Sequence, residues 1–150
     1  MLDENAVNAM GGTGNISVFL KGMIAGMDEN IRKQMEENGV DVDETLKRFM
    51  GREAIFMKFI MKFADDQSCK QIRDGLENRD VQLAFDRAHS LKGVAGNLGI
   101  VPVYTLAAQI SDLLRGKQEN EVDFDQVMDV QSRLEEACEK IYRIIEEYKQ

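Results

Sequence analysis

Apolar residues recur at helical spacing along most of the chain, and no stretch of convincing length alternates apolar and polar residues as a β-strand would. Short polar or glycine-containing segments, such as those around residues 38–39, 78–80 and 99, separate one apolar stripe from the next. Amphipathic helices joined by short turns pack as antiparallel neighbours. The sequence therefore predicts an all-α fold, namely an antiparallel four-helix bundle with short or accessory helices at its N-terminal side.

The pattern divides the chain into three parts. Residues 1–14 are polar and end in a glycine cluster, which predicts a flexible lead-in. Residues 15–38 carry apolar side chains at i, i+4, i+7, i+8 and i+11, which predicts an accessory amphipathic helix. Its apolar stripe has three candidate partners: the bundle itself, a second copy of the chain, or a domain further upstream. Residues 39–150 then form the helical bundle.

Capping residues mark where the helices of the bundle begin. Asp41, Asp80 and Asp123 each precede a segment of helical periodicity, as N-cap residues do. Pro102 suits the first turn of a helix. We predict a short helix after residue 41, a longer one that bends or restarts near residues 65–68, and three more that begin near residues 80, 102 and 123. The longer helix is predicted to point Ile55, Phe56, Phe59, Ile60 and Phe63 toward the core.

The helix that begins after Asp80 carries His89, the only histidine of the chain. Its apolar stripe consists of Ala84, Ala88, Leu91, Ala95 and Leu98. At about 100° per residue, His89 lies on the opposite side of the helix. Lys92, Gly93 and Gly96 share that side with it. Because two glycines inside a helix cost roughly 1 kcal/mol each relative to alanine, we predict that they serve the close approach of another molecule to an exposed His89.

Composition narrows the class of protein and its partners. A chain of 150 residues with 43% hydrophobic and 31% charged residues fits one folded domain, and the net charge of −8 argues against nucleic acid as a partner. No apolar run approaches the roughly 18 residues that span a bilayer, and the acidic N-terminus lacks the positive charge of a signal peptide. We therefore expect a cytoplasmic monomer without a membrane partner, unless it was cut from a larger membrane-anchored protein.

Other candidate chemistry in the sequence is weak. Cys69 and Cys138 show no metal-like spacing and are too few for a disulfide framework, so we expect buried, reduced thiols. The glycine cluster at residues 11–14 lacks the Gly-Lys-Ser/Thr ending of a phosphate-binding loop. One histidine without a cluster of carboxylates or thiolates is a poor metal site. We expect no metal site, no resident cofactor and no ATP-dependent kinase activity.

The surroundings of His89 suit a nucleophile instead. An unperturbed imidazole is largely neutral at pH 7, so one ring nitrogen offers a free lone pair. The ammonium group of Lys92 would attract an incoming phosphoryl oxygen, and Gly93 would leave the attacking nitrogen uncrowded. These features favour reversible phosphorylation of the ring by a partner that docks on this face of the helix.

The segment from His89 to Gly99 reads His-Ser-Leu-Lys-Gly-Val-Ala-Gly-Asn-Leu-Gly. It resembles the signature of the histidine-containing phosphotransfer (HPt) domains of two-component phosphorelays, His-x-Leu-Lys-Gly-x-Ala/Ser-x-x-hydrophobic-Gly. The segment from Gly39 to Phe63 also resembles the first helices of that family. The resemblance covers residues 38–117 by motif and extends to residue 148 by helix pattern.

The resemblance implies that His89 accepts a phosphoryl group from the aspartate of a receiver domain and passes it to another receiver domain. The expected partners are the receiver domains of response regulators, with a hybrid sensor histidine kinase as a further candidate, and Mg²⁺ would come with the receiver. Two alternatives remain open. In the first alternative, the chain is an HPt-like module that binds receivers without phosphotransfer. In the second, it is a fragment of a larger hybrid sensor histidine kinase.

The resemblance also implies supporting residues. HPt domains dock through apolar residues around the histidine, and by position these are Leu46, Phe49, Met50, Phe85 and Gly96. Ordinary core packing is the alternative for each of them. Some members of the family orient the ring with a glutamine on the following helix. The register puts Ser111 there, with Gln109 nearby, so the shorter serine leaves orientation of the ring to water or to Gln109.

Overall fold

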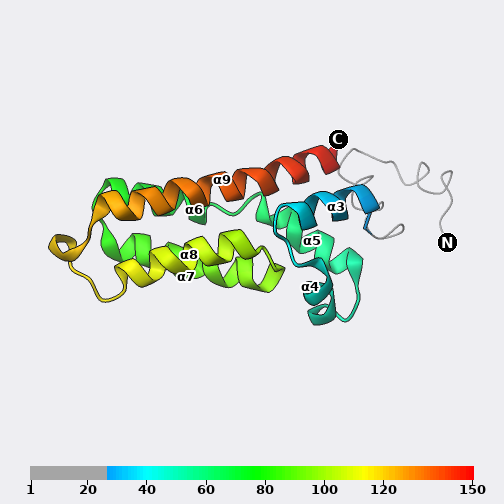
Figure 1. The fold of residues 1–150 in the computed structure, drawn as a ribbon, viewed down its shortest axis with the longest axis horizontal. Coiled ribbons are helices and arrows are strands. Elements are labelled where there is room, and N and C mark those ends of the chain that lie inside the picture. The colour runs from blue at the N-terminus through cyan, green and yellow to red at the C-terminus, as the bar shows by residue number, and fades with distance from the viewer. Residues whose placement is uncertain (1–26) are drawn as a thin grey trace.

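The computed structural model describes residues 27–150, and these residues are helical almost throughout, without a β-strand (Figure 1). In chain order the helices are α3 (Glu29–Glu37), α4 (Val42–Arg48), α5 (Glu53–Phe63), α6 (Ser68–Glu77), α7 (Val81–Leu98), α8 (Val101–Leu114), the short 3-10 helix η1 (Glu119–Glu121) and α9 (Phe124–Lys149). The predicted all-α fold is therefore confirmed. The predicted restart of the helix near residues 65–68 separates α5 from α6.

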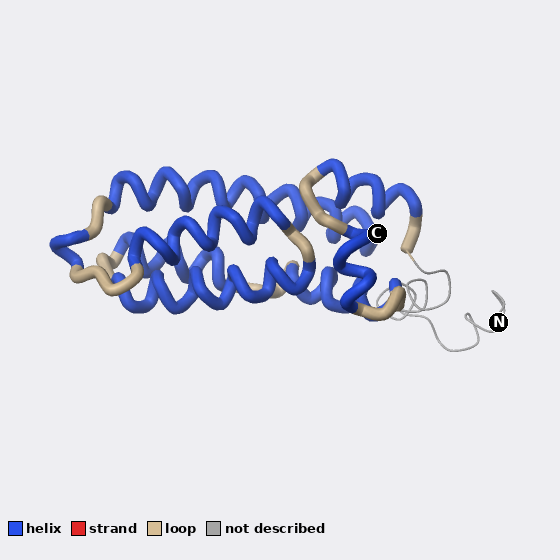
Figure 2. Tube along the Cα trace, turned by 60° about the horizontal axis from the view of Figure 1, so that its bottom comes forward, coloured by secondary structure: helices blue, strands red, loops and turns tan. Residues whose placement is uncertain are grey.

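The bundle consists of α6, α7, α8 and α9. Each of these helices packs against two others, in the order α6, α7, α8, α9 and back to α6. They lie side by side along the long axis of the molecule in both views (Figures 1 and 2). The remaining α-helices of the described residues, α3, α4 and α5, gather at one end of the bundle, where α9 extends far enough to contact both α3 and α5.

Small residues bring α6, α7 and α8 close together. The predicted stripe of α7 is buried throughout, and three of its five members are alanines. On the facing side, a Cβ atom at Gly75 of α6 would lie only 2.9 Å from the backbone nitrogen of Ala84. Because this contact leaves no room for a side chain, α7 is held tightly on its inner side, and its outer side is presented to solvent.

The predicted caps are present. The side chains of Asp41, Asp80 and Asp123 each accept a hydrogen bond from the backbone N–H three residues later, at 3.1–3.2 Å. Such a bond satisfies one of the amide groups that the first turn of a helix leaves without a partner. The N-cap of α7 therefore fixes where the helix that carries His89 begins.

A pair of backbone hydrogen bonds joins the start of α4 to the turn between α7 and α8. The N–H of Asp41 donates to the carbonyl of Gly99 at 2.8 Å, and the N–H of Val101 donates to the carbonyl of Gly39 at 3.1 Å. Gly99 has a φ of 71°, and a Cβ atom there would overlap the hydroxyl of Thr45. Glycine is therefore required at this turn, which anchors α4 beside the C-terminal end of α7.

The single helix predicted over residues 15–38 is interrupted at residues 27 and 28. Asp28 has an extended backbone, and its side chain accepts a hydrogen bond from the N–H of Asn30 at 2.7 Å, so α3 begins only at Glu29. The cap at Asp28 thus begins a separate helix at Glu29, at a position where the apolar spacing predicts an uninterrupted one. Ile31 and Met35 of α3 are buried in the common core, so this part of the stripe packs on the bundle. The predicted lead-in, and residues 15–26 of the predicted helix, lie outside the described residues.

Candidate functional site

His89 lies on the exposed side of α7, opposite the buried stripe, as the helical spacing predicts. The helix runs unbroken from Val81 to Leu98 in spite of its two internal glycines. Since α6 and α8 flank α7, the imidazole stands on the outer wall of the bundle. Among residues 27–150, no side chain forms a hydrogen bond with this ring.

The ring of Phe85 is the aromatic neighbour of His89. It lies one turn earlier on α7, with its centroid 6.1 Å from that of the imidazole and the two planes inclined by only 17°. The guanidinium group of Arg115, just after α8, lies 5.4 Å from the centroid of the same Phe85 ring. Arg115 also approaches the Ser111 hydroxyl and the Asp112 carboxylate, at 3.5 Å and 3.4 Å. The end of α8 therefore supports the ring on which His89 rests.

The two glycines of the motif have different surroundings. A Cβ atom at Gly93 would meet nothing within 4 Å, whereas one at Gly96 would lie 3.2 Å and 3.3 Å from two carbons of the Tyr104 ring on α8. Gly96 therefore allows α7 to pack closely against the Tyr104 ring of α8. Nothing among the described residues requires a glycine at position 93, so the open space there is available to a second molecule beside His89.

Lys92 and Tyr104 lie together on the α8 side of His89. The ammonium nitrogen of Lys92 is 5.9 Å from the centroid of the Tyr104 ring, a distance at which a cation is attracted to the face of an aromatic ring. Tyr104 is 42% exposed. The contact holds a positive charge one turn from the imidazole and leaves it accessible to an anion.

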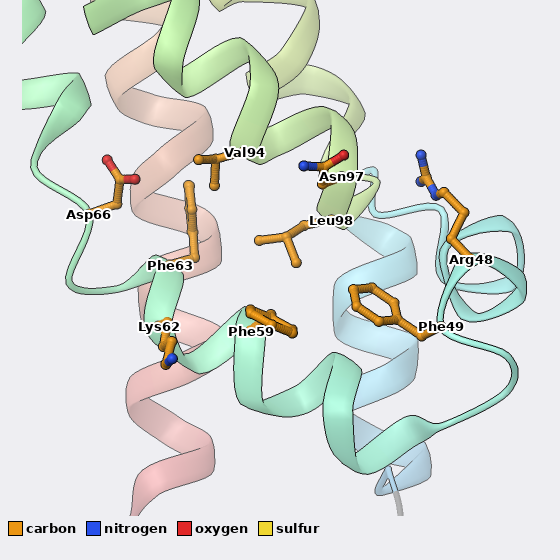
Figure 3. Close-up of a pocket in the computed structure, with 9 residues that line it drawn as sticks. All are labelled: Arg48, Phe49, Phe59, Lys62, Phe63, Asp66, Val94, Asn97 and Leu98. Carbon is orange, nitrogen blue, oxygen red and sulfur yellow. The ribbon is translucent and has the colours of Figure 1, made fainter.

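An apolar cavity of about 520 Å³ opens on the other side of α7 (Figure 3). We refer to it as the α7 groove. Its apolar lining consists of Phe49, Phe59, Phe63, Val94 and Leu98. Arg48, Lys62 and Asp66 add charged groups to the lining. Val94 and Asn97 in its lining follow Gly93 within about one turn of α7, so the groove opens beside the helix segment that comes after His89.

The predicted docking residues fall in different places. Phe49 is half-buried and lines the α7 groove, where its ring lies 5.7 Å from that of Phe59. Leu46 is half-buried and packs against the core, and Met50 is 81% exposed at the end of α4. Phe85 stacks on His89 as described above. Their predicted role in docking stays a prediction.

Phe59 is wrongly predicted as a core residue. It is 42% exposed and lines the α7 groove, although its spacing from Phe56 and Phe63 places all three on one face of α5. The apolar face of α5 is wider than the surface that α7 and α9 cover, so its edge remains open. A helical wheel shows which residues share a face but not where the neighbouring helix ends.

The two residues predicted to orient the ring do not contact it. Ser111 is fully buried in α8, and its described hydrogen bond is with Arg115. Gln109 is exposed and lines a shallow cavity between α8 and α9, together with Asp129 and Arg133. The support for the imidazole that sequence reasoning missed is the contact of Phe85 with Arg115, and no signal in the sequence links these two positions.

Two properties of the described residues bear on the chemistry of the site. Among residues 27–150, no three His, Cys, Asp or Glu side chains lie close enough together to hold a metal ion. No helix in this part of the chain is long and apolar enough to cross a membrane. Around the exposed imidazole of His89, the described residues place the Lys92 cation and the open space at Gly93, and the α7 groove opens further along the same helix.

A comparison with protein families gives one match. The model of the Hpt domain family matches residues 64–143. The match covers more than half of the chain and includes His89 and nearly all of the α6–α9 bundle. It does not include α4 or α5, the segment that was expected to resemble the first helices of the family. No curated protein and no solved structure matches the chain significantly.

Proposed function

Because the chain belongs to the Hpt domain family, whose members carry phosphoryl groups in two-component phosphorelays, we propose that it accepts a phosphoryl group on His89 from a receiver-domain aspartate and passes it to a second receiver domain. The observation that carries this proposal is the position of His89. The imidazole is exposed on the outer side of α7, beside a glycine whose missing side chain leaves open space.

The proposed transfer needs a nucleophile from this chain and a leaving group from the partner. An unprotonated ring nitrogen of His89 attacks the phosphorus of the aspartyl phosphate, the P–N bond forms, and the P–O bond to the aspartate breaks. The receiver regains its carboxylate. In the second transfer the carboxylate of another receiver attacks the same phosphorus, and His89 leaves as a neutral imidazole. Neither step requires a base from this chain.

Lys92 has an electrostatic role in this proposal. Its ammonium group, held near the Tyr104 ring on the same side of α7, attracts the phosphoryl oxygens as they approach His89. The charge then stabilises the phosphohistidine until the next receiver docks. We propose that Mg²⁺ is bound by the receiver and supplies the remaining charge neutralisation there.

The α7 groove is the proposed contact surface for the receiver domain. Val94 and Asn97 of its lining lie within about one turn of Gly93 on α7, so we propose that a partner that reaches His89 also covers the groove. Asp66, Val94 and Leu98 in its lining belong to the part of the chain that the family model matches, whereas Phe49 and Phe59 precede that part. We propose that the family-matched residues serve transfer, and that the residues before them contribute to the choice of receiver.

The experiment that tests the function follows a labelled phosphoryl group. A receiver domain carrying ³²P on its aspartate is mixed with the protein, and acid-labile, base-stable label is sought on this chain. We expect label on the wild type, none on His89→Gln, and slower labelling of Lys92→Ala than of Lys140→Ala, an exposed lysine of α9.

Two outcomes would contradict the proposal. Label that persists in His89→Gln would move the phosphoryl group to another residue. Stable binding of phosphorylated receivers without any transfer of label would instead support the receiver-binding module, the alternative in which the domain docks receivers but carries no phosphate.

A further inference from the structure

A second group of reactive side chains lies between α6 and α9. Cys69 of α6 and Cys138 of α9 line a cavity of about 260 Å³. Their side chains are buried, with exposed fractions of 6% and 1%, and both are free thiols. The two cysteines are far apart in the sequence, and folding of α9 onto α6 brings them to one place.

The contacts around Cys69 indicate that it is the more reactive of the two cysteines. Cys69 and Cys138 lie close enough that each thiol affects the ionisation of the other. Gln131, fully buried in α9, places its amide nitrogen 3.7 Å from the sulfur of Cys69 and donates a hydrogen bond to the carbonyl of Cys69 at 2.9 Å. Arg73, one turn after Cys69, adds a positive charge and is itself held by Glu135 through two hydrogen bonds of 2.5 Å and 2.6 Å.

These contacts make the two sulfurs unequal. The neighbouring Cys138 thiol lowers the pKa of the Cys69 thiol, and the Gln131 amide and the Arg73 charge also lower it, whereas burial and the charge of Glu135 raise it. The Cys69 thiol and burial raise the pKa of the Cys138 thiol. Because the Gln131 amide lies at the sulfur of Cys69 and Arg73 lies one turn away, we assign Cys69 as the first of the two to ionise.

We propose that Cys69 and Cys138 are a thiol oxidation site at which a small hydroperoxide forms a reversible disulfide between α6 and α9. The cavity that both side chains line gives a molecule of this size a path to the sulfurs. Its lining mixes Lys70 and Arg73 with Asp66 and Glu139, which suits a small neutral oxidant better than a strongly charged one.

The proposed reaction balances with one hydroperoxide. The Cys69 thiolate attacks an oxygen of hydrogen peroxide, the O–O bond breaks, and Cys69 becomes a sulfenic acid as hydroxide leaves. The hydroxide takes up the proton that the Cys69 thiol had released and becomes the first water. The sulfur of Cys138 then attacks the sulfur of Cys69, the S–S bond forms, and the S–O bond breaks. The proton of Cys138 leaves with the second water. A dithiol reverses the reaction and is itself oxidised to a disulfide.

The pair can be tested in the complete, folded chain because it has only two cysteines. The protein is treated with one equivalent of hydrogen peroxide, quenched, unfolded and alkylated, and its mass is measured. We expect both thiols to disappear together in a monomer that has lost two hydrogen atoms, and dithiothreitol to restore them. Thiols that both remain open to alkylation, or disulfides that form only between chains, would overturn the proposal.

Single substitutions test the order of the two steps. In Cys138→Ser the reaction should stop at a sulfenic acid on Cys69, which a 1,3-dicarbonyl probe traps. In Cys69→Ser, labelling by the probe should be at least severalfold slower. Equal labelling of the two variants would overturn the assignment of Cys69 as the attacking sulfur. Circular dichroism before oxidation verifies that each variant is folded, and the wild-type mass measurement does not depend on either substitution.

Discussion

The imidazole of His89 rests on the ring of Phe85, with 6.1 Å between the centroids and 17° between the planes. Among the described residues this contact takes the place of a hydrogen bond to the ring. The contact uses neither ring nitrogen. The interaction that orients the ring therefore leaves both nitrogens free for the proposed reaction. The arrangement assigns a positioning role to an aromatic residue one turn before the histidine.

Removal of that aromatic ring should slow transfer without unfolding the bundle. An aromatic pair contributes about 0.5–1.5 kcal/mol beyond its buried area, so Phe85→Ala is expected to lower the initial rate of label transfer roughly 2- to 10-fold. Phe85→Tyr keeps the ring and serves as the matched control. A rate in Phe85→Ala equal to that of the wild type would show that the stacking does not position His89.

Gly93→Ala should raise stability and lower transfer at the same time. A methyl group at position 93 meets no atom of the protein within 4 Å, and alanine in place of glycine inside a helix contributes about 0.5–1 kcal/mol. The same methyl group occupies the space that we assign to the partner. Thermal unfolding and the transfer assay on one sample measure both effects. A variant that is more stable and transfers at the wild-type rate would contradict this assignment.

Gly99→Ala should destabilise the protein by roughly 2 kcal/mol or more, because its Cβ atom would add a clash with Thr45 to the strain of a positive φ. Gly116 has a similar φ of 67°, and a Cβ atom there meets nothing within 4 Å. Gly116→Ala therefore measures the backbone strain alone. Urea unfolding of the two variants should give the larger loss for Gly99→Ala, and equal losses would refute the proposed clash.

The ion pair of Arg73 and Glu135 should stabilise the fold above a pH of about 5. The hydrogen bond from Arg73 lowers the pKa of the Glu135 carboxyl below its usual value of 4.5. A carboxyl with a lowered pKa in the folded state contributes stability that is present above its unfolded pKa and is lost as the pH falls through the folded value.

The measurement for this ion pair is the free energy of unfolding as a function of pH. Since the pair is partly exposed, Glu135→Gln should cost about 1 kcal/mol at pH 7, and the difference from the wild type should vanish in acid. Glu147→Gln, at an exposed position on the same helix, should show little difference at any pH. A cost for Glu135→Gln that stayed constant from pH 7 to pH 3 would mean that the charge is not responsible.

Two exposed apolar side chains, one inside the α7 groove and one outside it, allow a test of where the receiver domain binds. Phe59 is 42% exposed within the groove, and Met50 is 81% exposed outside it. If the receiver covers the groove, Phe59→Ala should weaken receiver binding by about 5-fold or more, as truncation of a buried aromatic anchor does. Met50→Ala should have a smaller effect. Calorimetric titration with a receiver domain would contradict the assignment if Met50→Ala lost more affinity.

Periodicity and capping residues predicted those parts of the fold that depend on one helix at a time. The exposure of His89, the buried stripe from Ala84 to Leu98 and the N-cap Asp80 follow from residues within a few turns of each other. The same information placed Gly93 and Gly96 on one side of α7 as if they were equivalent. Their difference comes from Tyr104, which belongs to another helix.

The features that sequence reasoning missed all join separate helices. Arg115 reaches Phe85 from the end of α8, and Cys69 meets Cys138 through the packing of α6 on α9. Which residue of one helix faces which residue of the next depends on their relative rotation and axial shift. A single sequence carries no local pattern for either quantity, since many rotations bury the same apolar stripe.

The two backbone hydrogen bonds between residues 39–41 and residues 99–101 also bear on local opening of the fold. They join the start of α4 to the turn after α7, so both sides of this junction should open and close together. The amides of Asp41 and Val101 should then exchange with deuterium at matched rates. Local opening of this junction would separate α7 from one wall of the α7 groove while the bundle stays folded.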